Sequence, residues 1–368
     1  EFYMSNLTPI AIVGSNAEIN AQLLSALAVY FEVKIFTDTS LALDILQQEP
    51  HYALIVDNNV KPTGGLPFLE SAKKIPGVMA IPCILLVDKH SEKLVTESDF
   101  GIDFDYLVNP INRKELLTKV SEGVNASVET SWEQLPDGQR RVLTETVGIF
   151  RDTFNVMRDG QPIPVHEIEK SCSPLVEAIE NDQVTGLLNT VQQHDDYTYV
   201  HSLRVAIYLS LLGHAVGMKG DELMTLSSGG LMHDLGKGLV PQEVLNKPAK
   251  LDEAEFNIMK THVDFTKEIF GKSHDITVGV EIIALQHHEK LDGSGYPLGL
   301  KGKELNTLAR MGSIVDIYSA LTDRRVYKPA MPPEKALGIM GEMKNGLDMA
   351  LLDTFKEFLM DATNQPEG

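Results

Sequence analysis

The stretch GLMHDLGK, residues 230–237, decides how this 368-residue chain is interpreted. It places the adjacent pair His233 and Asp234 at the end of an apolar run, and Lys237 follows three residues later. A carboxylate can bridge two divalent cations while the neighbouring imidazole binds one of them. The pair alone is weak evidence, because His-Asp also occurs by chance and at helix C-termini. Its meaning depends on residues further along the chain.

Imidazole and carboxylate side chains recur about one predicted helix apart on both sides of this pair. The chain has 11 His residues, and eight of them lie between positions 194 and 288. Helices that present inward-facing ligands to a common core can build a dinuclear metal site. The residues that we expect to converge are His201, His233, Asp234, His262, His287, His288 and Asp316. A hydrogen-bonded structural role is more common for a single His, and we assign that role to His214 and His274.

Composition and charge limit the kind of protein. Hydrophobic residues make up 43% and charged residues 23% of the chain, which is normal for globular domains and enough for two of them. A net charge of −20 argues against a general nucleic-acid binder, so we expect no DNA partner. Two Cys give no disulfide framework, which predicts a cytoplasmic protein. No apolar run reaches about 18 residues, so we expect no membrane span.

Residues 8–122 predict an α/β domain with a doubly wound parallel sheet. Short β-like runs alternate there with helical segments, and the third run ends in the carboxylate of Asp57. In such sheets functional groups gather at the carboxyl ends of the strands. The expected strands lie near residues 10–13, 33–36, 53–57, 84–87 and 106–108. Residues 1–7 are expected to be an N-terminal tail that begins with a remnant of cloning.

Residues 123–193 are expected to contain a linker and connecting helices. The polar segment 125–138 is interrupted by Pro136 and Gly138 and is expected to be the linker. Apolar residues at helical spacing predict a helix over 139–157, and a further helix is expected over 174–190. These helices could transmit a signal, pair in a homodimer, or pack on the second domain. The sequence leaves these alternatives open.

Residues 194–368 predict an all-α helical bundle. Asp252 and Glu255 form a capping-box pattern that opens the helix carrying His262. The two adjacent imidazoles end another helix and are followed by the turn-rich segment 289–297, EKLDGSGYP. Its glycines permit positive φ and its Pro fixes the exit of the loop. As a loop this segment is ordinary, but the pattern His-His-Glu-x-x-Asp-Gly-x-Gly-Tyr-Pro is highly specific.

Residues 198–330 resemble an HD-GYP domain, the bacterial family of cyclic di-GMP phosphodiesterases. The resemblance implies one metal held by His201, His233, Asp234 and Asp316. It implies a second metal that shares Asp234 and is also held by His262, His287 and His288. Iron or manganese would suit this mixed ligand set. Members with a third metal carry Glu where this chain has Tyr197, so we expect two metals.

The resemblance also implies a reaction: hydrolysis of cyclic di-GMP to pGpG, with GMP as a further product left open. The metals would activate a water that attacks the phosphate, with Asp234 and Lys237 as the catalytic pair. Arg325 and Lys328 match the basic pair that grips the substrate, although Val326 replaces the usual Pro. A solvated basic turn is the alternative for that segment. Gly295 and Tyr296 of the loop are further candidate substrate contacts.

Residues 8–122 resemble a response-regulator receiver domain, with Asp57 at the phospho-acceptor position. The family's acidic pair is replaced by Gly14 and Ser15, its Thr or Ser by Asp88, and its Lys by Asn109. Phosphoryl transfer to Asp needs a cation that the acidic pair would hold. We therefore interpret the domain as a pseudo-receiver that mediates dimerisation or partner contact, and Asp57 as a solvated strand-end carboxylate.

Two other functions stay open from the sequence. One is a non-hydrolysing module that binds a cyclic dinucleotide or contacts a signalling protein such as a diguanylate cyclase. The other is a phosphodiesterase specific for cyclic GMP-AMP, since the GYP loop cannot separate two cyclic dinucleotides that differ by one base edge.

Overall fold

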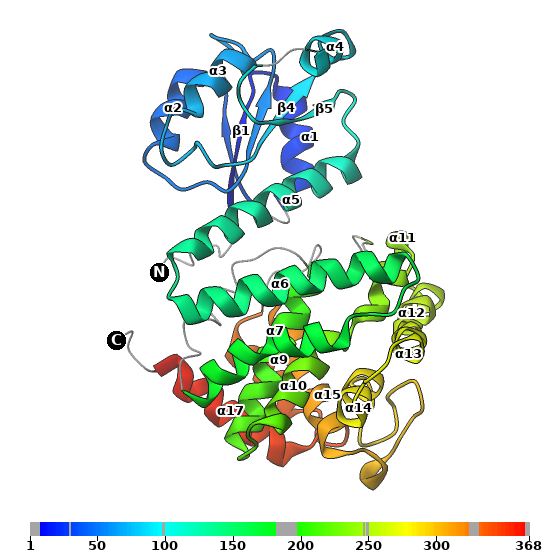
Figure 1. Ribbon diagram of the computed structural model, residues 1–368. Helices are drawn as coiled ribbons and strands as arrows, with labels where there is room; N and C mark the ends of the chain where they lie inside the picture. Colours follow the sequence, from blue (N-terminus) through cyan, green and yellow to red (C-terminus); the bar gives the residue numbers. More distant parts are fainter. Residues whose placement is uncertain are drawn as a thin grey trace. The chain divides into compact units, whose positions relative to one another are not determined.

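The computed structural model describes residues 8–28, 31–97, 100–181, 197–245, 247, 250–323 and 331–364. The chain divides into two compact units (Figure 1). The first comprises the described residues up to 134, and the second comprises the described residues from 135 onward.

The first unit is a five-stranded parallel sheet in the order β2-β1-β3-β4-β5. This order is that of a doubly wound fold, as the sequence predicts. The elements alternate along the chain as β1 Pro9–Val13, α1 Ala17–Leu27, β2 Glu32–Phe36, α2 Thr39–Leu46, β3 Leu54–Asp57, α3 Gly65–Ala72, β4 Cys83–Val87, α4 Lys89–Glu97, β5 Asp105–Val108, α5 Arg113–Ser131 and the short η1 Trp132–Gln134.

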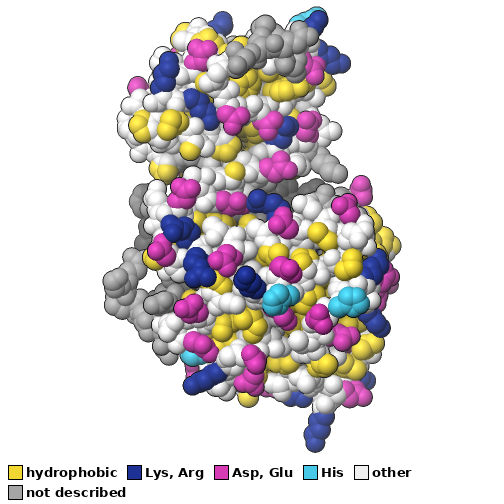
Figure 2. All heavy atoms as spheres, in the orientation of Figure 1, with side chains coloured by type: hydrophobic (Ala, Val, Ile, Leu, Met, Phe, Trp, Pro, Cys, Tyr) yellow, Lys and Arg dark blue, Asp and Glu magenta, His cyan; other side chains and the backbone are white. Residues whose placement is uncertain are grey.

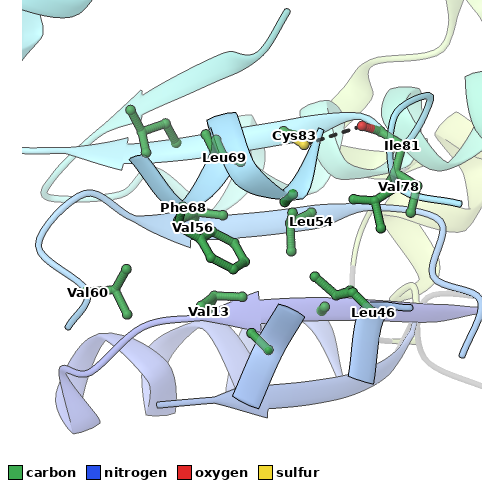
Figure 3. Close-up of a cluster of buried hydrophobic side chains, with 14 of the residues drawn as sticks. Val13, Leu46, Leu54, Val56, Val60, Phe68, Leu69, Val78, Ile81 and Cys83 are labelled. Atoms are coloured by element: carbon green, nitrogen blue, oxygen red, sulfur yellow. Dashed lines mark hydrogen bonds between the residues drawn. The ribbon is translucent and has the colours of Figure 1, made fainter. Parts of the chain in front are cut away.

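One face of this sheet carries a buried apolar cluster (Figure 3). Val13 and Val56 lie on neighbouring strands, and Phe68 and Leu69 of α3 are buried in the same cluster. Leu46 of α2 joins them, so helices α2 and α3 cover this face. Strands buried on both faces need nearly continuous apolar runs, which explains the run at residues 53–56.

Helix α5 continues through part of the segment that we expected to be a linker. It runs to Ser131, although a linker was predicted over residues 125–138. Leu116, Val120 and Val124 are buried at helical spacing, and Ser127 Oγ donates to the Tyr52 carbonyl oxygen at 3.0 Å. The linker prediction is therefore wrong for residues 125–131, because apolar contacts at every fourth residue outweigh the polar composition.

The second unit is helical in all its described residues, as predicted. Its elements are α6 Asp137–Arg158, α7 Val165–Glu180, α9 Tyr197–Ala215, α10 Asp221–Met232, η2 Leu235–Leu239, α11 Gln242–Leu245, α12 Glu253–Lys260, α13 His262–Lys272, α14 Val278–Gln286, η3 Gly302–Glu304, α15 Thr307–Thr322, α16 Pro333–Gly341 and α17 Met349–Asn364. Helices α6 and α7 pack on each other, and α7 also contacts α9 and α10. The expected helix over 174–190 begins earlier, at Val165, and its second half lies outside the described residues.

Glycines let α10 approach two neighbouring helices closely. A Cβ on Gly230 would lie 2.6 Å from Ala206 Cα of α9, and one on Gly229 would lie 2.6 Å from Ile283 Cδ1 of α14. Helix α10 can therefore pack directly against both. This contact brings the His233–Asp234 pair at its C-terminal end into the centre of the unit, where both side chains are buried.

In the described part of the chain, no helix is long and apolar enough to span a bilayer. On the face drawn in Figure 2, acidic side chains are distributed over both units, in keeping with the net charge of −20.

Because Gly230 lies so close to α9, replacing it with Ala should destabilise the protein, whereas the same replacement at an open helix position stabilises it. In an open helix position, Gly→Ala stabilises a protein by about 1 kcal/mol. Gly338 in α16 has no atom within 4 Å of its would-be Cβ, so Gly338→Ala should follow that rule. Gly230→Ala should instead lower the free energy of unfolding by about 1–3 kcal/mol, because the added methyl meets backbone atoms of α9. Urea unfolding of both variants measures this, and a Gly230→Ala protein as stable as Gly338→Ala would contradict it.

Candidate metal centre

Two groups of potential metal ligands share one residue, Asp234. The ligand atoms within each group lie within 4.8 Å of one another. The first group is His201, His233 and Asp234. The second group is Asp234, His262, His287 and His288. The structure therefore brings together all the sequence-predicted imidazoles around a common carboxylate.

Each carboxylate oxygen of Asp234 faces a different group of imidazoles. Oδ2 lies 3.1 Å from His233 Nε2 and 3.5 Å from His201 Nε2. Oδ1 lies 3.3 Å from His262 Nε2 and 3.8 Å from His287 Nε2. A carboxylate with one oxygen toward each set of imidazoles has the arrangement needed to bridge two cations.

Asp316 of α15 also contacts both groups. Its Oδ1 lies 3.2 Å from His201 Nε2 and 3.9 Å from His233 Nε2. Its Oδ2 lies 3.4 Å from His288 Nδ1. The predicted assignment of Asp316 to the group with His201 and His233 is compatible with these distances, and its second oxygen faces the other group.

A close packing contact holds the segment after Asp234 in place. A Cβ on Gly236 would lie 1.9 Å from the His262 carbonyl oxygen, so only glycine fits there. The Gly236 N–H donates to Thr266 Oγ1 at 3.0 Å, and Thr266 Oγ1 donates to the His262 carbonyl at 2.9 Å. The short helix η2 thus lies directly on α13, which explains how Asp234 reaches His262.

Hydrogen bonds orient three of the imidazoles. Their Nδ1 atoms donate to backbone carbonyls one turn earlier: His233 to Gly230 at 2.6 Å, His262 to Met259 at 2.7 Å and His287 to Ala284 at 2.9 Å. A proton on Nδ1 leaves the Nε2 lone pair directed toward Asp234.

The atoms that face one another across the centre lack hydrogen bonds. Nε2 of His233, His262 and His287 and Oδ1 of Asp234 are buried and have no hydrogen-bond partner among the described residues. Buried polar atoms are normally satisfied, so such a cluster calls for a partner that side chains do not supply. Imidazole nitrogens and carboxylate oxygens suit a divalent transition metal. The residues present therefore fit the two-metal site that the sequence predicts.

Burial and neighbouring charges set the protonation states that a metal requires. Burial lowers the pKa of His262, holds that of His287 well below its usual range, and lowers that of His288 to about 3. Burial alone would raise the pKa of Asp234, but His233 and Lys237 hold it well below the ordinary value. Neutral imidazoles beside an ionised carboxylate are ready to bind a cation without first losing protons.

His201 differs from the other imidazoles. Burial lowers its pKa, but hydrogen bonds to Asp316 and Asp323 outweigh burial and raise the pKa to about 9. A cation that binds His201 Nε2 must therefore displace a proton from this imidazole.

Comparisons with known proteins agree with this geometry. Residues 176–351 match the family model described as HD domain. The match covers 176 of the 368 residues, so this part of the chain is similar to HD domains. Members of this family bind divalent metal, which the buried His and Asp cluster can accommodate. The fold also resembles that of a solved structure described as an HDG"Y"P protein, Bd1817 of Bdellovibrio bacteriovorus, with a TM-score of 0.51 and 18% identity, covering 67% of this chain and 81% of that one.

Two curated relatives show what this chain is similar to. One is a 3'3'-cGAMP-specific phosphodiesterase of Vibrio cholerae, 38% identical over 46% of this chain and 36% of its own length. The other is the cyclic di-GMP phosphodiesterase response regulator RpfG of Xanthomonas campestris, 28% identical over 78% of this chain and 70% of its own length. The chain thus spans about a third of the first relative. The predicted resemblance to HD-GYP proteins with a receiver-like first domain is confirmed.

The buried carboxylate of Glu289 fixes the GYP loop. From the sequence, this residue was recognised only as one letter of the motif. Glu289 accepts backbone N–H groups from Leu298 at 2.6 Å, Gly299 at 3.1 Å and Leu300 at 3.0 Å. A Cβ on Gly295 would lie 2.5 Å from the His288 carbonyl oxygen, so the loop folds tightly onto its own beginning. Glu289 therefore positions the loop rather than a ligand.

The predicted catalytic and substrate residues differ in how far the structure describes them. The Lys237 ammonium pairs with Asp234, so it lies at the metal centre. The Tyr296 ring stacks on His288, with centroids 4.5 Å apart and an interplanar angle of 29°. Arg325 and Lys328 lie outside the described residues. Their substrate role stays a prediction.

The predicted phospho-acceptor Asp57 is buried, and the expectation of a solvated carboxylate is wrong. Its side chain lies at the end of β3 under the turn that follows, where Oδ1 accepts the Asn59 N–H at 2.9 Å. Asn20 Nδ2 donates to the Gly14 carbonyl at 2.6 Å. A Cβ on Gly14 would lie 2.7 Å from Asn20 Oδ1 and 3.3 Å from Asp57 Cβ, so Asn20 and Asp57 both pack against Gly14. In the part of the chain that is described, both groups of metal-ligating residues lie in the second unit and neither includes Asp57.

Asp323 is a residue of the centre that sequence reasoning missed. Its Oδ2 accepts from His201 Nδ1 at 2.6 Å, and its Oδ1 pairs with the Arg204 guanidinium. Burial raises the pKa of Asp323, but Arg204 and His201 outweigh burial and lower it to about 2. The available signal was its position seven residues after Asp316, which places both carboxylates on one side of α15.

Removing the charge of Asp323 should weaken metal binding. Asp323→Asn keeps the shape of the side chain but no longer stabilises the orientation and basicity of His201. Losing such a carboxylate partner typically costs about 10–100-fold in metal affinity. Competition between the protein and a chelator for Mn(II) measures this. Asp353→Asn, on the exposed face of α17, is the control. Equal affinities for the two folded variants would contradict the role of Asp323.

Proposed function

We propose that this protein is a metal-dependent phosphodiesterase that hydrolyses cyclic di-GMP to pGpG. The main support for this proposal is that one oxygen of Asp234 faces His233 and the other faces His262. A pair of adjacent divalent ions is a general arrangement for cleaving phosphodiesters. The names of several relatives support the substrate class, because they are cyclic di-GMP phosphodiesterases.

The residues have distinct tasks in this proposal. The seven predicted ligands would hold two ions, and iron or manganese would suit their mixed imidazole and carboxylate donors. When bound, the ions supply Lewis acidity toward the phosphate oxygens and acidify water. Asp234 keeps the two positions adjacent. The Lys237 ammonium stabilises negative charge on the phosphate or donates a proton to the leaving 3′-oxygen, and Tyr296 forms one wall of the substrate site beside His288.

A second substrate is favoured by one comparison. The relative that shares 38% identity with this chain is specific for 3'3'-cGAMP. Cyclic GMP-AMP keeps both phosphodiesters of cyclic di-GMP and changes one base, so the metal centre would treat the two alike. Discrimination between them must come from residues that contact the bases.

We also propose that the first unit does not use Asp57 as a phospho-acceptor. Gly14 and Ser15 offer no carboxylate where the receiver family has its acidic pair. Without a cation held there, negative charge on an acyl phosphate lacks compensation. Contact with a partner, or with a second copy of the chain, is the role that this proposal leaves for the unit.

Chromatography of cyclic dinucleotides tests the proposed activity. Protein loaded anaerobically with Fe(II) or with Mn(II) should convert cyclic di-GMP to pGpG, and cyclic GMP-AMP assayed in parallel would rank the two substrates. Asp234→Asn should lose activity by at least about a thousandfold, because both ion positions lose their shared ligand. Intact cyclic di-GMP and cyclic GMP-AMP with folded, metal-loaded protein would overturn the proposal and favour a non-hydrolysing binding module.

A further inference from the structure

A lysine without a carboxylate partner lies beside the metal centre. Lys260 is the last residue of α12 and precedes His262 by two positions. Nearby lysines are neutralised: Lys237 pairs with Asp234, and Lys247 pairs with Glu255. For Lys260, no Asp or Glu of the described chain lies within ion-pairing distance.

Two aromatic rings hold the Lys260 ammonium instead. Its Nζ lies 5.2 Å from the centroid of the Phe256 ring and 5.9 Å from that of Tyr296. The two rings meet edge to face, with centroids 6.3 Å apart and an interplanar angle of 83°. Tyr296 stacks in turn on His288, a member of the second ligand group. A continuous path of contacts therefore leads from the ligand group to Lys260.

Phe256 extends this path to the surface. It lies one turn before Lys260 on α12, and 47% of its surface is exposed. Ligand sites are lined mainly by hydrophobic and aromatic side chains together with a few polar or charged groups. The exposed part of Phe256 offers a stacking surface close to the metal centre that no described residue of the chain covers.

The contacts of Lys260 within the described chain leave its positive charge without a negative partner, which favours a role in binding an anion. Lys260 is a partly exposed residue, and cation–π contacts contribute only about 0.5–1 kcal/mol at exposed sites. The chain contains 52 acidic residues and could readily supply a carboxylate partner. Lys260 instead keeps its positive charge available next to a centre that fits a phosphodiester.

We propose that Lys260, Phe256 and Tyr296 form a second subsite, which binds the phosphodiester of a cyclic dinucleotide that is not being cleaved. This inference rests on the proposed function. A cyclic dinucleotide carries two phosphodiesters, separated by a ribose on each side of the ring. While the metal centre holds one, the other requires a cation of its own, and Lys260 supplies it.

Phe256 has a complementary task in this subsite. The purine next to the second phosphodiester stacks on the exposed part of its ring. Stacking of a base on an aromatic side chain contributes about 1–3 kcal/mol and tolerates either purine. The subsite is built from α12 and from Tyr296 of the GYP loop, which is already a candidate substrate contact. Lys260 and Phe256 are additional to the residues that the family resemblance implies.

Comparing a dinucleotide with a compact diester tests the subsite. Lys260→Met should raise KM for cyclic di-GMP about tenfold, which corresponds to about 1.4 kcal/mol. The kcat, the metal content, and the kcat/KM for bis(p-nitrophenyl) phosphate, which has no second phosphate, should stay unchanged. Lys267→Met, which removes an exposed lysine of α13, is the charge-matched control and should behave like the wild type. Phe256→Leu should raise KM for cyclic di-GMP as well.

Three kinetic results would overturn the subsite. The first is an unchanged KM for cyclic di-GMP in Lys260→Met, and the second is a loss of kcat/KM by the same factor on cyclic di-GMP and on bis(p-nitrophenyl) phosphate. The third is a rise in KM in Lys267→Met as large as that in Lys260→Met. If the wild type hydrolyses no cyclic dinucleotide, the proposed function fails, and equilibrium binding of cyclic di-GMP to metal-loaded protein tests the subsite separately. A Kd about tenfold weaker in Lys260→Met supports it. An equal Kd, or no binding by the wild type, overturns it.

Discussion

The second unit depends on one buried carboxylate that faces two sets of imidazoles. Asp234 can do so only because the chain around it approaches other helices without side-chain obstruction. Gly230 admits the backbone of α9, and Gly236 admits the backbone of α13. The GLMHDLGK stretch therefore encodes the packing of three helices as well as the ligands that those helices bring together.

The same arrangement is electrostatically demanding. Asp234, Asp316 and Asp323 are all buried, and an uncompensated buried charge is strongly unfavourable. Lys237 and Arg204 offset two of these charges, and bound cations would offset more. Because the unfolded chain cannot assemble the ligands, part of the metal's binding free energy would stabilise the fold of this unit. Metal binding and folding would thus be linked through the same side chains.

The candidate metal centre could be predicted from the sequence because most of its potential ligands are unusual residues at helix ends, whereas His201 and Asp316 lie within α9 and α15. A His-Asp pair, a His-His pair and an isolated His after a capping box are all visible as local patterns. The doubly wound first unit was visible for a similar reason, since its apolar runs alternate regularly with helical segments. Local patterns of this kind can be recognised in a sequence without knowing which residues are in contact in the fold.

Residues whose role arises from long-range packing were not predictable in the same way. Asp323 reaches His201 across 122 positions of sequence, and nothing near either residue indicates the contact. Lys260 resembles any helical lysine until the structure shows that aromatic rings hold it and that described carboxylates do not. The continuation of α5 into the expected linker has the same cause, because buried contacts of Val124 outweigh local composition.

Electron paramagnetic resonance of protein loaded with Mn(II) under anaerobic conditions tests the shared carboxylate most directly. If Asp234 bridges two ions, titration should end at two Mn(II) per chain, and the spectrum should be that of an exchange-coupled pair. Asp234→Asn should lose the coupling. A wild-type protein that binds a single Mn(II), or two ions with the spectrum of isolated Mn(II), would contradict the account.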